Sequence, residues 1–158
     1  MTELKKKRLE KHLTQQEAAD LIGVSLRSYV SYENDESKTK TSKYRFLLRE
    51  VEELNRIDEE HGILSMDDIV RKCSEVFRDY QVNYCYLFGS YAKGTATDSS
   101  DVDLLISTET TGLKYYELVE RLRSSLCKRV DLLDLRQLIK NEKLADEILK
   151  DGIRIYGQ

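Results

Sequence analysis

Residues 87–106 read LFGSYAKGTATDSSDVDLLI, in which one apolar run ends at a Gly-Ser pair and aspartates surround the start of a second apolar run. Side chains alternate between the two faces of a strand, so Asp101 and Asp103 share one face while the intervening Val102 faces the core. The stretch therefore predicts two strands, with a pair of carboxylates at the edge where the second strand begins.

A third carboxylate follows in KRVDLLDL, residues 128–135, where Asp131 stands at the start of the next predicted strand. It completes a triad if the two strands are neighbours. Three carboxylates repel one another, and Mg²⁺, which prefers hard oxygen ligands and takes substrate phosphates, removes that repulsion. Two such ions about 4 Å apart can activate an attacking oxygen and stabilise a leaving one. Gly89 and Ser90 lie where backbone N–H groups and a hydroxyl can approach a triphosphate.

With these residues in place, the chain resembles the nucleotidyltransferase superfamily that includes DNA polymerase beta, in its minimal (MNT) branch, over nearly all of residues 64–158. The resemblance implies ATP as nucleotide donor and two Mg²⁺ ions as cofactors. It implies that Gly89 and Ser90 hold the nucleotide phosphates and that Asp101 and Asp103 bind both metals. Asp131 would bind the catalytic metal and help to deprotonate the acceptor hydroxyl.

The first third of the chain predicts short helices joined at Gly23, with a capping box formed by Thr14 and Glu17. Residues 13–35, LTQQEAADLIGVSLRSYVSYEND, resemble the helix-turn-helix of the lambda-repressor-like (XRE) family. The resemblance places residues 25–33 in the major groove of DNA, with Arg27 as the best base reader. The predicted DNA-contacting set is Gln15, Ser25, Leu26, Arg27, Ser28 and Ser31, with Gln15 on a phosphate. The alternative is a module for protein docking or dimerisation that does not bind DNA.

Apolar periodicity divides the chain into an all-helical domain, residues 1–62, and a mixed domain, residues 63–158. A long amphipathic helix from Tyr44 to Ile57, ending near Gly62, closes the first domain. Its apolar stripe either provides a dimer seam or packs onto the second domain. The second domain alternates helices with strands over 82–88, 102–107, 129–135 and 153–156, with helices over 65–80, 113–127 and 138–150. The predicted fold class is α+β, a helix-turn-helix domain followed by a polymerase-beta-like α/β domain with a small mixed sheet flanked by helices.

Charge is unevenly distributed along the chain. Residues 1–49 carry 11 Lys/Arg and seven Asp/Glu, whereas residues 50–158 carry 15 and 22. A basic segment favours contact with a polyanion, and an acidic one favours divalent cations. No apolar run reaches the roughly 18 residues that span a bilayer, so we expect a cytoplasmic protein with no membrane partner.

The two resemblances together predict an antitoxin that adenylylates a HEPN-type toxin and binds operator DNA to regulate its own synthesis. Operator half-sites would imply a homodimer. Two alternatives stay open. One is a nucleotidyltransferase acting on a small molecule such as an aminoglycoside. The other is a DNA-binding regulator or sequestering antitoxin without catalysis.

Overall fold

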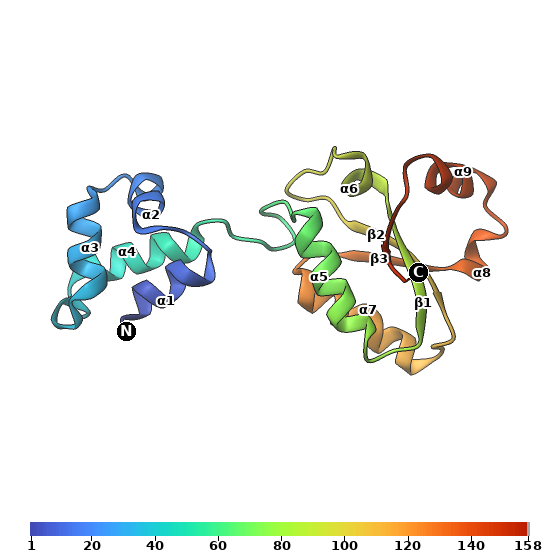
Figure 1. Cartoon of the computed structure of the whole chain (residues 1–158), viewed down its shortest axis with the longest axis horizontal. Coiled ribbons are helices and arrows are strands. Elements are labelled where there is room, and N and C mark those ends of the chain that lie inside the picture. The colour runs from blue at the N-terminus through green and yellow to red at the C-terminus, as the bar shows by residue number, and fades with distance from the viewer. Residues whose placement is uncertain (158) are drawn as a thin grey trace. The chain divides into compact units, whose positions relative to one another are not determined.

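The computed structural model describes residues 1–157. The chain divides into two compact units, Met1–Arg56 and Ile57–Gln158, which we name the head and the body (Figure 1). The sequence places the boundary between its two predicted domains at Gly62 instead, and the division into two functional domains stays a prediction.

The head is built of helices that begin at capping side chains. The hydroxyls of Thr2, Thr14, Ser25 and Thr41 each accept a backbone N–H of the helix that follows, which satisfies donors that have no partner within the helix. Gly23 ends the second helix with φ +80°, a left-handed conformation that glycine adopts readily. The elements are α1 (Glu3–Glu10), α2 (Gln15–Ile22), α3 (Leu26–Asn34), a 3₁₀ turn η1 (Glu36–Lys38) and α4 (Ser42–Glu53).

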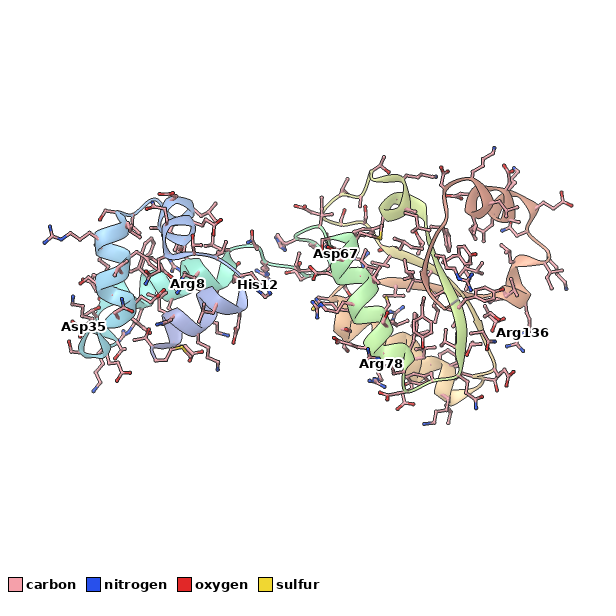
Figure 2. All side chains as sticks on the ribbon, viewed as in Figure 1. Arg8, His12, Asp35, Asp67, Arg78 and Arg136 are labelled. Atoms are coloured by element: carbon pink, nitrogen blue, oxygen red, sulfur yellow. The ribbon has the colours of Figure 1, made fainter. Side chains whose placement is uncertain are left out.

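A buried ion pair joins the first and third helices. Arg8 lies among the helices of the head (Figure 2), and its guanidinium donates to both carboxylate oxygens of Glu33 at 2.7 and 2.9 Å and to the carbonyl of Leu13 at 2.6 Å. The Glu33 side chain is fully buried, so removing either partner would leave an uncompensated charge inside the head.

Helix α4 is shorter than predicted. It ends at Glu53 because Leu54 is extended and Asn55 is left-handed with φ +49°, although apolar residues keep helical spacing as far as Ile57. Its apolar stripe packs against α1 and α2 in the head's own core, so the predicted alternative in which the stripe packs onto the second domain is wrong for its buried part. The buried part of that stripe is Tyr44, Leu47 and Val51.

The body is a mixed sheet with helices on both faces (Figure 1). Its strands are β1 (Val82–Phe88), β2 (Val102–Thr108), β3 (Val130–Asp134) and β4 (Ile153–Tyr156). Its helices are α5 (Met66–Phe77), α6 (Gly89–Lys93), α7 (Leu113–Leu126), α8 (Leu135–Leu138) and α9 (Glu142–Asp151). The strand order is β3-β2-β1-β4, with β2 and β3 parallel and the other pairs antiparallel. This arrangement confirms the predicted fold class.

Strand alternation gives the two faces of the sheet different roles. On one face, buried residues such as Val102, Leu104 and Leu132 form the main core with α5 and α7. On the other face, Phe88 and Leu105 pack with α8 and α9 in a smaller cluster. The second face is therefore the one on which polar side chains can stay accessible.

The Gly-Ser pair that follows β1 opens the short helix α6. One local prediction for the body was wrong. The predicted helix over residues 138–150 is two helices, because the chain leaves α8 after Leu138 and α9 starts anew at Asn141, whose side chain accepts from the N–H of Leu144. Within residues 1–157, no helix combines the length and apolar composition needed to cross a membrane.

Candidate active site

The predicted carboxylates lie at the edge of the sheet where β2 and β3 begin. Asp103 of β2 stands directly opposite Asp131 of β3 in the parallel register, and opposite Phe88 at the end of β1. Asp101 precedes β2 and is exposed, as is Asp131, while Asp103 is half-buried. The condition that β2 and β3 be neighbours is met, so the fold brings Asp103 and Asp131 to one face. Their chemical roles stay predictions.

Asp103 is the carboxyl group most affected by this environment. Burial, followed by the negative charges of Asp131, Asp101 and Glu147, raises the pKa of Asp103 to about 6. Both causes penalise the ionised form, because burial removes the charged carboxylate from water and the neighbouring negative charges repel it. A cation at this edge would reverse the penalty, which makes Asp103 the centre of the candidate site.

Gly89 packs directly against the Asp103 carboxylate. Its φ of +70° lies in the left-handed region, and a Cβ built on Gly89 would fall 2.1 Å from Oδ2 of Asp103. Any side chain at this position would therefore displace the carboxylate. The glycine forms part of the cradle around Asp103, and Ser90 follows it, half-buried, in α6.

The donor set suits Mg²⁺ in its chemistry, since it consists of carboxylate oxygens from adjacent strands. Among residues 1–157, no three His, Cys, Asp or Glu side chains meet as a ready-made ligand group. The parallel register nevertheless sets the carboxylates of Asp103 and Asp131 next to each other on one face of the sheet. The residues fit a divalent cation in type and in place on the sheet, and a bound nucleotide would contribute further oxygens.

A fourth carboxylate at this edge was not predicted. Glu147 of α9 influences Asp103 electrostatically and accepts a salt bridge from Lys93 of α6, with Nζ to Oε1 at 2.9 Å. Lys93 and Glu147 are far apart in the sequence, and their contact joins two helices that no sequence pattern places together. No local pattern could have identified Glu147, because only the packing of α9 onto α6 brings it there.

Lys128 and Arg129, which directly precede β3, hold residues 57–62 beside the candidate site. The almost fully buried Lys128 donates through Nζ to the carbonyl oxygens of His61 at 3.2 Å and Asp98 at 2.5 Å. Arg129 pairs with Glu59 at 3.2 Å and Glu60 at 2.7 Å. The segment 57–62 is thereby held near the loop that leads to Asp101.

The predicted DNA-reading residues lie at the start of α3. Ser25 caps the helix, its hydroxyl accepting from the N–H of Ser28 at 3.2 Å. Leu26 and Arg27 are exposed, and Ser28 is half-buried. The first turn of α3 therefore presents Leu26 and Arg27 to solvent, as reading a major groove would require.

The other two residues of that set are engaged within the head. The Gln15 amide donates to Oε1 of Glu33 at 2.8 Å, and the Ser31 hydroxyl accepts from Nζ of Lys38. Their DNA contacts stay predictions.

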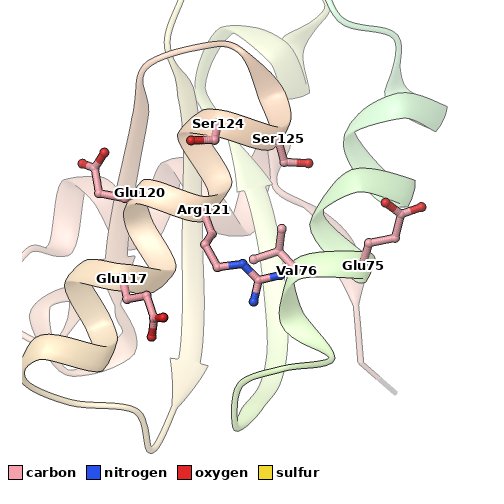
Figure 3. A pocket seen from close by; sticks show the side chains of 7 residues that line it. All are labelled: Glu75, Val76, Glu117, Glu120, Arg121, Ser124 and Ser125. Carbon is pink, nitrogen blue, oxygen red and sulfur yellow. The ribbon is translucent and has the colours of Figure 1, made fainter.

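A hollow lies between α5 and α7, the helices that cover the sheet face opposite to Asp103 (Figure 3). It has a volume of about 510 Å³, and Figure 3 shows the Arg121 side chain of α7 extending toward Val76 of α5. Arg121 is itself paired with Asp79 at 2.7 Å. This hollow contains no predicted site residue.

Comparison with known proteins identifies the family of the body. Residues 71–158 match the family described as polymerase beta, nucleotidyltransferase. The chain belongs to this nucleotidyltransferase family. Residues 4–49 match a helix-turn-helix family, so both resemblances inferred from the sequence are confirmed.

Individual relatives of the nucleotidyltransferase carry related names. The Methanocaldococcus jannaschii protein MJ0128, named as a candidate protein adenylyltransferase, is 34% identical over 96 residues, covering 59% of this chain and 97% of that protein. The protein adenylyltransferase MntA of Shewanella oneidensis is 35% identical over 74 residues, covering 46% of this chain and 52% of MntA. A crystal structure of a toxin-antitoxin with AMP-PNP is similar at 30% identity, with a TM-score of 0.49, over 56% of this chain and 73% of that one.

Proposed function

We propose that this nucleotidyltransferase transfers AMP from ATP to a hydroxyl of a partner protein and releases pyrophosphate. The observation that carries the proposal is the in-register pair of Asp103 and Asp131, with Gly89 packed against the Asp103 carboxylate. Two adjacent carboxylates next to a glycine suit a site where a bound cation offsets the repulsion between the carboxylates and also binds the phosphates of a nucleotide.

Each residue has a distinct part in this proposal. Bound Mg²⁺ would supply charge neutralisation for the phosphates and a more reactive acceptor oxygen. Asp101 and Asp103 would hold two ions, and Asp131 would hold one and accept the proton of the acceptor hydroxyl. The backbone at Gly89 and the hydroxyl of Ser90 would orient the triphosphate. The acceptor oxygen bonds to the α-phosphorus as the bond to pyrophosphate breaks.

The acceptor we propose is a HEPN-type toxin, which makes the chain an antitoxin acting in the cytoplasm. Relatives that carry the name protein adenylyltransferase support a protein as acceptor. The HEPN class follows from the resemblance to the minimal nucleotidyltransferases described above.

The test is incubation of the chain with α-labelled ATP, Mg²⁺ and the HEPN-type protein encoded by the adjacent gene. We expect label on that protein, and none with the Asp101→Ala variant or in EDTA. If Asp101→Ala still neutralises the toxin while no label is transferred, the protein acts by sequestration. If label reaches only an added aminoglycoside, the acceptor is a small molecule. Either result contradicts the proposal.

We further propose that the head binds operator DNA as a homodimer. The exposed Leu26 and Arg27 at the start of α3 and the helix-turn-helix match support this. Loss of a bidentate arginine contact to guanine costs about 1–3 kcal/mol, so Arg27→Ala should weaken operator binding by roughly 5-fold to 150-fold. Arg45→Ala, an exposed arginine on α4, is the control. Equal footprints for both variants would refute the assignment of the recognition helix.

A further inference from the structure

An open groove lies between the sheet and the two C-terminal helices of the body. Its volume is about 650 Å³, within the range of sites that bind ligands or side chains of a partner. Aromatic and aliphatic side chains form most of its wall, among them Tyr84, Tyr86, Leu105, Leu135, Leu138 and Ile148.

The groove opens on the same sheet face as the catalytic carboxylates. Leu105 follows Asp103 by two residues on β2, so the two side chains share a face and lie about 7 Å apart along the strand. Tyr86 stands opposite Leu105, just as Phe88 stands opposite Asp103. An occupant of the groove would therefore lie one side-chain step from the candidate active site.

Helix α9 borders both places. Glu147 acts electrostatically on Asp103, and the next two residues, Ile148 and Leu149, line the groove. Ile148 is buried, but Leu149 is 87% exposed. Leu149 thus extends the apolar wall of the groove to its rim, and a contiguous apolar surface of this kind is typical of an interaction site.

The rim also carries a positive charge. The Arg154 guanidinium lies 5.6 Å from the centre of the Tyr84 ring. Among the residues that the structure describes, no carboxylate lies within salt-bridge distance of Arg154. An occupant that combines apolar side chains with an acidic residue would match both the wall and the rim.

We propose that this groove receives an amphipathic helix of the protein acceptor, with an acidic residue facing Arg154, and so brings the acceptor hydroxyl to Asp131. Two turns of helix span about 11 Å, which is enough to reach from the Leu105 level of the groove to the carboxylates. Apolar residues at i, i+3, i+4 and i+7 would fill the groove. This inference rests on the proposed function, since it requires that the acceptor be a protein.

The groove is tested with Leu149→Gln, using Leu113→Gln as the matched control. Leu113 is also 87% exposed, but it lies at the start of α7 and does not line the groove. Neither change removes buried contacts, so both variants should fold as the unaltered chain does, which thermal unfolding checks. The probe is the purified HEPN-type protein of the adjacent gene, and the readouts are its Kd in the absence of ATP and the KM for its labelling.

We expect Leu149→Gln to raise both Kd and KM about tenfold, because the variant loses the apolar area that Leu149 would bury against the partner, with ATP binding unchanged. Leu113→Gln should change neither. Arg154→Glu should also raise Kd, and should reduce its dependence on salt. Equal Kd for the unaltered chain and Leu149→Gln would overturn the inference.

Other occupants give distinguishable results. If Leu149→Gln converts a dimer of the chain alone into monomers, the groove is a contact between two copies, and the inference is wrong. If it weakens binding of a small acceptor but not of the protein, the inference is also wrong. If the unaltered chain binds the partner without labelling it, the proposed transfer fails, yet a tenfold rise in Kd with Leu149→Gln would still establish the groove as the docking site.

Discussion

Replacement of Gly89 by alanine should damage the candidate active site more than it damages the fold. The new Cβ would stand 2.1 Å from Oδ2 of Asp103, whereas real Cβ contacts begin near 3.0 Å. The carboxylate must therefore move by about 1 Å, and a displacement of that size costs roughly 100-fold in rate. The left-handed φ of +70° adds about 1–2 kcal/mol of strain, which should lower the Tm of the body by roughly 5–10 °C.

Gly94→Ala supplies the matched control for Gly89→Ala. Gly94 has a nearly equal φ of +73°, but a Cβ there would meet nothing within 4 Å. Both variants should lose similar stability in a thermal melt, and only Gly89→Ala should lose labelling of the partner with α-labelled ATP at a temperature where both are folded. Equal activity of the two variants would refute the role of Gly89 as a cradle for Asp103.

Three further substitutions test the charges and the backbone. Burial opposes ionisation of Glu33, but hydrogen bonds from Arg8 and Gln15 leave the pKa of Glu33 below its usual value, so the pair stabilises the head above pH 4.5 and is lost as the pH falls through that lowered pKa. Glu33→Gln should cost about 3–5 kcal/mol at pH 7 and should flatten this acid dependence in chemical denaturation; an unchanged acid limb would contradict it. Since the pKa of Asp103 is raised to about 6, the ionised form of Asp103 destabilises the body at higher pH. Asp103→Asn should therefore raise the Tm at pH 8 in EDTA and leave it unchanged at pH 4. A lower Tm of this variant at pH 8 would be evidence against repulsion between the carboxylates. Cys127 ends α7 with φ +55°, so Cys127→Gly should gain about 0.5–1 kcal/mol in urea unfolding, and a loss would show that this conformation is unstrained.

The sequence predicted the face on which each carboxylate lies, because strand alternation is a local property. It predicted Asp103 and Asp131 as one group only under the condition that their strands be neighbours. The parallel pairing of β2 with β3 satisfies that condition with the two residues in exact register. Pairing of this kind depends on how the whole sheet assembles, and no short stretch of sequence encodes it.

Helix α4 shows where periodicity alone misleads. Apolar residues continue at helical spacing through Leu54 and Ile57, yet the backbone turns away after Glu53, and the segment that follows is held by Arg129 through Glu59 and Glu60. The spacing predicts which residues are buried, but it does not predict which of the two units buries them. Val51 packs in the head, whereas Ile57 packs against the main core of the body.

The two faces of the sheet explain how a domain of this size can carry charges that oppose its own folding. The face covered by α5 and α7 buries nearly all of the main core, so it supplies most of the free energy of folding. The opposite face can then keep Asp103 in a half-buried place that raises its pKa, and can leave Leu149 exposed beside an open groove. Along β2 the two roles alternate residue by residue, with Val102 and Leu104 in the core and Asp103 and Leu105 on the other face. The repulsion among the carboxylates is tolerated because burial of the adjacent residues of the same strand contributes favourable free energy that offsets it.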